Sequence, residues 1–585
     1  MGGSAQVSSN GSPPNPGIPI LRHSLTLSSA GVFLASLAIQ FIGFIATVAL
    51  YHYVGTGNSG QTLLGTVQLY LLIGSSINNV ADLRIGSAFV FFVARGKDPR
   101  GSTGTYLILR SLMVGLAGLT IFALAPVSVL GATLAPTPQD LEIVGAFAAM
   151  PLLWSLSTVY NQLLVAQGNS LRAQVPSLVE ACVRTPILVY VAIYSPSIWS
   201  ITIAYAIGAT ASAVVSLPTT LRLASWFKSS EARLMFRYAW PLMGGLMLGF
   251  LATNSIPFLV AAKFNTQQLN IFLAANAFRI LALSIPAAII VPLFPYLSGK
   301  HKQAEYETVR SGTWQALRYT AIVIVPGVVA LVVYRVNFLN ILANASYAHS
   351  AATPLAILAI SSVPLALSQV IGTALNSIGQ QRLELYLTAA QIVALFGTAF
   401  LLFPPITLYP GMSGVVAASV ATLASAIVAL VLNTYFMHRL MAVRIRLRSI
   451  VSIVVSAGVS FFAVSQFNSH LPVNRYYQLL LGVLIGYTAY LLILALIGEL
   501  SRQDVRLIGG SIGIPRRLTD PFARLCWRED SPAVNAADLS HARGLRPLEL
   551  PETFTGEGEH ADVFAPVGPS APDEESFPGP PTGES

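Results

Sequence analysis

Charged and amide side chains lie inside apolar runs that are long enough to cross a membrane. Asn78, Asp82 and Arg84 share one run, and Asn276 and Arg279 share another. A charge near the centre of a bilayer costs about 2.5–3.5 kcal/mol, so such residues usually face a cavity or a partner. Arginine can bind a phosphate group through two parallel hydrogen bonds. The chemistry that these residues could do is therefore the binding of an anion inside the membrane.

The spacing of the first group predicts an irregularity in its helix. Asn78 lies one turn before Asp82, so both side chains point to the same side. Asp82 and Arg84 are two residues apart, so on an unbroken helix they point to different sides and do not neutralise each other. Either the helix breaks near Gly86, with Asp82 holding the break or orienting a neighbouring group, or one of the two charges faces a polar lumen.

Two interpretations of the arginines stay open. Arg84 can extend its side chain to the cytoplasmic surface, or it can line a lumen. Arg279 lies deeper in its run and shares a helix face with Asn276, which favours a cavity. Glu180 and Arg184 are spaced i,i+4, and we interpret them as a structural pair on one helix.

Acidic residues are scarce around these arginines. No Asp or Glu precedes Asp82, and none lies between Glu231 and Glu305, a stretch that covers the predicted seventh and eighth spans. A lumen lined by the first, second, seventh and eighth spans is therefore expected to be cationic and to attract anions.

The elements that position these residues are predicted to be membrane-spanning helices. Of the 585 residues, 54% are hydrophobic and only 10% are charged, whereas soluble domains carry about 25% charged residues. Apolar stretches recur from Leu27 to Leu500, and each is long enough to cross a hydrocarbon core of roughly 30 Å. This composition excludes a water-soluble protein.

Hydropathy predicts an all-α polytopic membrane protein with about fourteen transmembrane helices. The expected spans are 27–52, 63–94, 107–130, 141–165, 174–194, 198–220, 239–261, 270–297, 316–335, 352–376, 384–403, 411–437, 450–467 and 477–499. The second run is too long for a straight crossing, so we expect a tilt or a break there.

The distribution of Lys and Arg predicts the orientation of the spans. One set of connections holds Arg95, Lys97, Arg100, Arg110, Arg172, Arg222, Lys228, Arg233, Arg237, Lys300, Lys302, Arg310, Arg382, Arg439, Arg444, Arg446 and Arg448. The alternate set holds Lys263, Arg335 and Arg475. The positive-inside rule then places both termini in the cytoplasm.

Sequence similarity between two segments predicts an internal repeat. "LLVAQGNSLRAQVPSLVEA" and "ALNSIGQQRLELYLTAAQI" each join two spans through a Gly-polar-basic turn, and their Gly168 and Gly379 lie 211 residues apart. Parallel repeats of this kind occur in transporters. The expected organisation is a disordered cytoplasmic N-terminus (1–26), an N-lobe of six spans (27–220), a C-lobe of six spans (239–437), two further spans (450–499) and a mostly disordered acidic cytoplasmic tail (500–585).

The sequence disfavours an enzyme. The outer loops are short, and the first, "YHYVGTGNSGQ", carries no acid. Phosphate-binding glycine loops, nucleophile elbows and HExxH are absent. Cys182 and Cys526 have no metal-ligand spacing, and we expect no disulfide between them. We predict no cofactor and no metal.

Four segments resemble the polysaccharide (O-antigen type) flippases of the multidrug/oligosaccharidyl-lipid/polysaccharide exporter superfamily. They are "DLRIGSAFVFFVARG", "VPLFPYLSGKHKQAEYETV", "ALNSIGQQRLELYLTAAQI" and "YPGMSGVVAASVATLASAIV", and the resemblance extends over about residues 25–498. Arg84 occupies the position of the first glycine in the family's Asp-Leu-Gly-type motif.

The resemblance implies two six-helix lobes that form a V around a cavity lined largely by spans one, two, seven and eight. It implies alternating access that moves a lipid-linked oligosaccharide across the inner membrane, and Arg84 and Arg279 are the positions that could hold its pyrophosphate. Expected partners are this substrate, membrane lipids and a glycan polymerase or glycosyltransferases, with no nucleic acid. A drug/cation antiporter of the same superfamily and a membrane enzyme of glycan assembly remain as alternatives; the antiporter requires a buried carboxylate in span one, seven or eight, and none is present.

Overall fold

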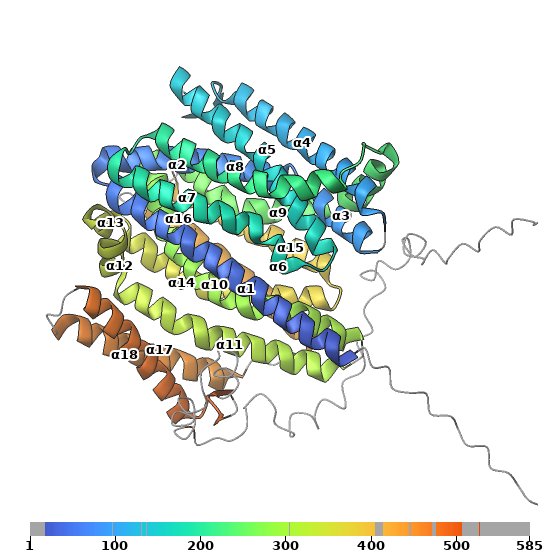
Figure 1. The fold of residues 1–585 in the computed structure, drawn as a ribbon. Helices are drawn as coiled ribbons and strands as arrows, with labels where there is room; N and C mark the ends of the chain where they lie inside the picture. Colours follow the sequence, from blue (N-terminus) through green and yellow to red (C-terminus); the bar gives the residue numbers. More distant parts are fainter. Residues whose placement is uncertain are drawn as a thin grey trace, which may run out of the picture. The chain divides into compact units, whose positions relative to one another are not determined.

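The computed structural model describes residues 18–95, 97–129, 132–135, 137–302, 305–403, 413–443, 446–470, 475–502, 504–505 and 526. The chain divides into two units, Met1–Val534 and Asn535–Ser585, and all described residues belong to the first. Within them the fold is almost entirely helical (Figure 1). One short antiparallel hairpin, β1 (Ser128–Val129) and β2 (Ala132–Thr133), accounts for the strands of the described part.

The helices of the first half of the chain are α1 (Ile18–Ala49), the π-helical turn η1 (Leu50–Val54), α2 (Gly57–Val80), α3 (Ile85–Ala94), α4 (Pro99–Leu124), α5 (Pro138–Ala166), α6 (Ser170–Ala173), α7 (Val175–Tyr194) and α8 (Ile198–Leu223). Those of the second half are α9 (Ser229–Lys263), α10 (Thr266–Lys302), α11 (Tyr306–Val333), α12 (Arg335–Leu342), α13 (Ala345–Ser350), α14 (Ala352–Ser377), α15 (Gln381–Leu402), α16 (Gly414–Met441), α17 (Leu447–His470) and α18 (Arg475–Ile497).

The predicted class, an all-α polytopic membrane protein, is confirmed. Among the described residues, twelve helices are long and apolar enough to cross a membrane, and the bent pair α2–α3 makes a thirteenth candidate. The remaining predicted span, 270–297, lies within α10, and several of its side chains lie outside the described residues. α1 begins at Ile18, inside the N-terminal segment for which the composition predicted disorder.

The helices pack mainly against others from the same half of the chain. In the first half α4, α5, α7 and α8 contact one another, and in the second half α10, α11, α14, α15 and α16 do the same (Figure 1). α2 packs against α10 and joins the two sets, while α9 contacts α3 and α4 on one side and α15 on the other. α17 and α18 lie together beside α11.

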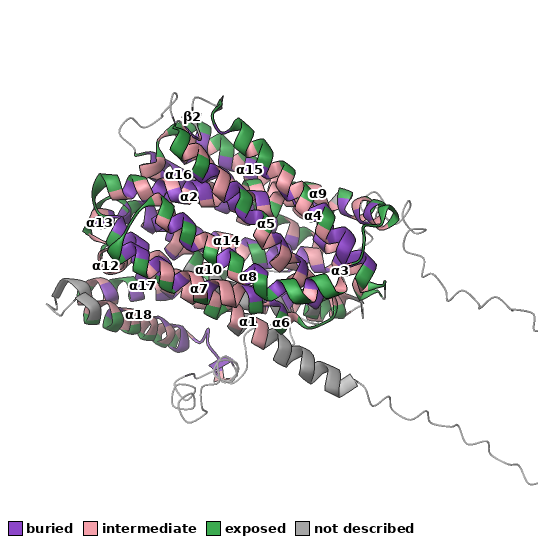
Figure 2. Cartoon of the chain, turned by 45° about the horizontal axis from the view of Figure 1, so that its top comes forward, coloured by how far each residue is buried: buried purple, intermediate pink, exposed green. Residues whose placement is uncertain are grey.

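Burial follows this packing. Buried residues lie on the helix faces that meet neighbouring helices, while apolar residues remain exposed on the outward faces (Figure 2). On α4, for example, Leu112, Leu116 and Leu119 are all exposed. Contiguous exposed apolar surface of this kind suits contact with lipid rather than water.

The two turns that suggested a repeat have the same backbone geometry. Gly168 and Gly379 both adopt positive φ, at 79° and 86°, a conformation that glycine reaches without steric cost. After each glycine the next amide donates back into the preceding helix, from Asn169 N to Leu164 O at 2.8 Å and from Gln380 N to Leu375 O at 3.0 Å. Both turns are therefore glycine-dependent helix C-caps.

The first residues after α18 are packed against α11. Arg318 donates from Nε to Glu499 Oε1 at 2.9 Å and from Nη2 to Asp504 Oδ2 at 2.6 Å, and it also donates to the Glu499 carbonyl. Tyr319 donates to Asp504 Oδ1 at 2.6 Å, and Cys526 is buried in the same cluster. The composition predicted a mostly disordered tail over 500–585, but Asp504 and Cys526 of this segment are packed against the helices.

Candidate functional site

The second membrane segment is interrupted, as its length and charges predicted. α2 ends at Val80, α3 begins at Ile85, and their axes differ by 42°. Between them Leu83 and Arg84 adopt left-handed conformations, with φ of 46° and 62°. Non-glycine residues rarely adopt this conformation, which costs about 1–3 kcal/mol and persists only where the surroundings enforce it. The break therefore lies just before Gly86.

Asp82 stabilises this break. Its Oδ2 accepts a hydrogen bond from the Gly86 amide at 3.2 Å, which begins the new helix. Its Oδ1 accepts from the Tyr106 hydroxyl at 2.7 Å and from Arg110 Nη1 at 2.5 Å. A Cβ on Gly86 would lie 2.6 Å from the Tyr106 hydroxyl oxygen, so the turn needs a residue without a side chain here.

Arg110 is the partner that sequence reasoning missed. The prediction that it lies in a cytoplasmic connection is wrong, because α4 begins at Pro99 and Arg110 is buried inside it, with 2% of its side chain exposed. Its Nη2 donates to Asn78 Oδ1 at 2.7 Å, to the Asn78 carbonyl at 3.1 Å and to Thr158 Oγ1 at 3.3 Å. The available signal was Asp82 itself, because a carboxylate in an apolar run requires a cation on a neighbouring helix.

These residues form one wall of a polar cavity of about 540 Å³. It is lined by Asn78, Asn79, Asp82, Arg84, Arg110, Thr158, Asn161, Gln162 and Glu180, together with serines, Trp154 and Leu246. Its lining comes from α2, the break, α3, α4, α5, α7 and α8, with Leu246 from α9. Among the described residues this cavity therefore belongs mainly to the first half of the chain, rather than to spans one, two, seven and eight.

Most charges in the polar cavity are neutralised by a partner. Asp82 pairs with Arg110, and Glu180 pairs with Arg184 at 2.7 Å, as their i,i+4 spacing predicted. The Arg184 guanidinium also lies over the Tyr205 ring, 4.9 Å from its centroid. Arg84 differs: its side chain is exposed on the cavity wall, and no ion pair within the described part of the chain involves it. The cavity therefore presents one available guanidinium to an anion.

Comparison with known protein families finds a match in the central region of the chain. Residues 77–352 match the polysaccharide biosynthesis protein family. This confirms the resemblance that the sequence motifs indicated. Among curated sequences none matches the chain.

Solved structures show the same fold. "Lipid II flippase MurJ, inward closed conformation" aligns with a TM-score of 0.67 at 12% identity, over 80% of this chain and 98% of that chain. An inward-facing multidrug resistance MATE family transporter of the MOP superfamily aligns with a TM-score of 0.56 at 15% identity, over 70% and 98% of the two chains. An outward-facing MATE transporter aligns with a TM-score of 0.51 at 12% identity, over 71% and 95%.

The break bears on the one position where this chain departs from the Asp-Leu-Gly-type motif that the sequence resemblance implies. The resemblance expects a glycine where Arg84 stands, and the left-handed φ of 62° is the conformation that glycine adopts freely. With arginine at this position the backbone conformation is strained. The Arg84 side chain lies on the wall of the polar cavity.

The two site residues predicted on the eighth span lie elsewhere. Asn276 and Arg279 are on α10 and do not line the polar cavity with Asn78, Asp82 and Arg84. Arg279 Nε is buried and has no hydrogen-bond partner among the described residues. A buried, unsatisfied guanidinium nitrogen is costly, so Arg279 remains a candidate for binding an anion.

Proposed function

We propose that this protein is a flippase that moves a lipid-linked oligosaccharide, or another anionic polysaccharide precursor, across the cytoplasmic membrane by alternating access. The family match of residues 77–352 and the fold shared with a lipid II flippase and MATE transporters support a carrier. The polar cavity supports an anionic substrate, because Arg84 lies on its wall while the other charges of the cavity are neutralised by ion pairs.

The substrate class follows from this electrostatic arrangement. A guanidinium without an ionic partner can form charge-assisted hydrogen bonds to phosphate oxygens. The neighbouring amides and hydroxyls of the cavity, such as Asn79, Asn161 and Gln162, can bind sugar hydroxyls. Arg279 would bind the phosphate in a second conformation of the transport cycle, since it does not share the polar cavity with Arg84.

The proposal includes an orientation and partners. The Lys and Arg asymmetry of the connections supports a topology with both termini in the cytoplasm, and the proposed location is the inner membrane. The sugar composition of the substrate would be that of a surface polysaccharide, such as O-antigen, and enzymes that assemble or polymerise this glycan would supply and consume the substrate.

Export of glycan in a deletion strain tests the proposal. Loss of the protein should cause lipid-linked oligosaccharide to accumulate in the inner leaflet, and the wild-type chain should reverse this. Arg84→Ala should lower export about 10- to 100-fold, because a hydrogen bond to a charged group contributes about 1.5–3 kcal/mol. Arg84→Lys should recover only part, because an ammonium cannot form the planar two-fold contact.

A matched control and two contrary results sharpen this test. Arg382→Ala removes an exposed arginine at the start of α15 and should leave export unchanged. Normal export by Arg84→Ala at equal protein abundance would show that Arg84 only anchors its helix at the membrane surface. Unchanged lipid-linked glycan in the deletion strain, together with sensitivity to cationic drugs, would favour an antiporter instead.

A further inference from the structure

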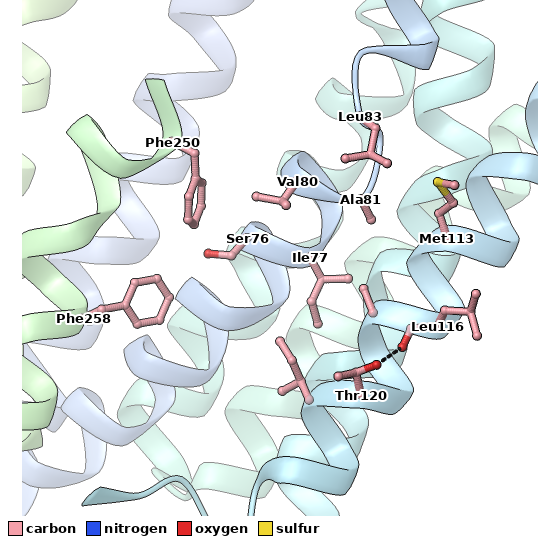
Figure 3. A pocket seen from close by; sticks show the side chains of 12 residues that line it. Ser76, Ile77, Val80, Ala81, Leu83, Met113, Leu116, Thr120, Phe250 and Phe258 are labelled. Atoms are coloured by element: carbon pink, nitrogen blue, oxygen red, sulfur yellow. Dashed lines mark hydrogen bonds between the residues drawn. The ribbon is translucent and has the colours of Figure 1, made fainter. Parts of the chain in front are cut away.

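The broken segment separates the polar cavity from a second cavity of opposite character. This apolar cavity has a volume of about 590 Å³ and is lined by α2, the break, α4 and α9 (Figure 3). Leu83 lines the apolar cavity, while the next residue, Arg84, lines the polar one. Both have left-handed φ. The strained backbone therefore places consecutive side chains in two different environments.

The end of α2 and the first residues of the break show the same division. Ile77, Val80 and Ala81 line the apolar cavity, whereas Asn78, Asn79 and Asp82 line the polar cavity. In Figure 3 Val80 points towards Phe250, and Ile77 lies on the side of Leu116 and Thr120. One helix end thus presents hydrocarbon to one side and hydrogen-bonding groups to the other.

The apolar cavity offers almost no polar group despite two hydroxyl residues in its wall. Ser76 donates to the Leu72 carbonyl at 2.5 Å, and Thr120 donates to the Leu116 carbonyl at 2.8 Å, as the dashed line in Figure 3 shows. Hydroxyls that are bonded to their own helix backbone do not need a ligand. The rest of the wall consists of aliphatic side chains with Met113, Phe250 and Phe258.

Two features connect the apolar cavity with lipid and with the polar cavity. Leu116 lines the apolar cavity and is 56% exposed on the outward, lipid-suited face of α4. On α9, Leu246 lines the polar cavity, and Phe250, one helical turn later, lines the apolar cavity. The two cavities therefore adjoin both at the break and along α9.

We propose that the apolar cavity binds the hydrocarbon chain of the same amphiphile whose phosphate binds at Arg84. The occupant is the chain segment next to the phosphate, because consecutive residues, Leu83 and Arg84, line the two cavities. This inference rests on the proposed function for the substrate class. On this proposal, the break between α2 and α3 binds the junction between the phosphate and the lipid chain.

Photolabelling of the purified full-length protein in lipid nanodiscs tests this site. The probe is a polyprenyl phosphate with a diazirine in its first isoprene unit, and labelled peptides are located by mass spectrometry. Labelling is expected within residues 76–83, 113–121 or 250–258. Unlabelled polyprenyl phosphate should compete, and phosphatidylglycerol should not. Labelling confined to other helices, or equal competition by phosphatidylglycerol, would overturn the proposal.

A cavity-filling variant provides a second test. Ala117→Trp places an indole in the apolar cavity and should reduce labelling of these peptides at least about tenfold, which corresponds to 1.4 kcal/mol of binding free energy. Leu119→Trp is the matched control, because Leu119 is on the same helix but is 64% exposed and outside the cavity lining. Equal labelling of the two variants, with both eluting as folded protein, would refute the site.

The outcomes separate this inference from the proposed function. If wild-type labelling occurs as expected but the deletion strain accumulates no lipid-linked glycan, the amphiphile site stands and flippase function fails. If Arg84→Ala abolishes glycan export while labelling lies elsewhere, flippase function stands and the chain-binding site is wrong.

Discussion

Removal of the Asp82 carboxylate should destabilise the protein strongly, because it leaves the buried Arg110 guanidinium without its ionic partner. Asp82 accepts hydrogen bonds from Arg110, Tyr106 and the Gly86 amide. Breaking a buried ion pair by removing one partner costs about 3–5 kcal/mol. The Asp82 side chain is 18% exposed and Arg110 only 2%, so water can reach the carboxylate but hardly the guanidinium. We therefore expect Asp82→Ala to lower the free energy of unfolding by about 3 kcal/mol, at the lower end of that range.

The double variant distinguishes an unpaired charge from general loss of packing. Arg110 would retain contacts with Asn78 and Thr158, but its Nε already lacks a partner among the described residues. Replacing both members of a buried pair by apolar groups is often close to neutral. Asp82→Ala combined with Arg110→Met should therefore be more stable than Asp82→Ala alone, with a coupling energy of about 2 kcal/mol.

The assay is reversible unfolding of the purified protein in mixed micelles, followed by circular dichroism, with each variant compared at the same protein concentration. Glu142→Ala removes an exposed carboxylate and serves as control, with an expected change within about 0.5 kcal/mol. A loss below about 1 kcal/mol for Asp82→Ala, or strict additivity in the double variant, would refute the reasoning.

Two further predictions concern the docked tail and the break. Burial raises the pKa of Asp504, but hydrogen bonds from two side chains of α11 outweigh it and hold the pKa below its usual value. This stabilisation is present above about pH 4 and is lost as pH falls through the lower folded-state pKa; Asp504→Asn should remove that part of the acid dependence in unfolding titrations. Gly86→Ala would place a Cβ 2.6 Å from the Tyr106 hydroxyl and 3.1 Å from Asp82 Oδ2, so a loss of about 1–3 kcal/mol is expected. Gly244→Ala, where a Cβ meets nothing within 4 Å, should be neutral or slightly stabilising, and equal unfolding midpoints for both alanine variants would contradict the steric argument.

Features that depend on neighbouring residues could be predicted from the sequence. Helical membrane segments follow from composition and the length of apolar runs, and the Glu180–Arg184 pair follows from its i,i+4 spacing. The interruption near Gly86 follows because an overlong run carries two charges that an unbroken helix directs to different sides. The turns at Gly168 and Gly379 follow from a glycine placed at the end of a span.

Features that join distant parts of the chain were decided by the tertiary structure. Arg110 is 28 residues from Asp82, and Arg318 is 181 residues from Glu499. Residue types and local spacing cannot select between many possible cation–carboxylate pairs, because the choice depends on which helix faces meet and at what height. The same reason separates Arg279 from the polar cavity. The left-handed conformation of Arg84, which the residue type disfavours, persists because the contacts of Asp82 with the neighbouring helix hold the break in place.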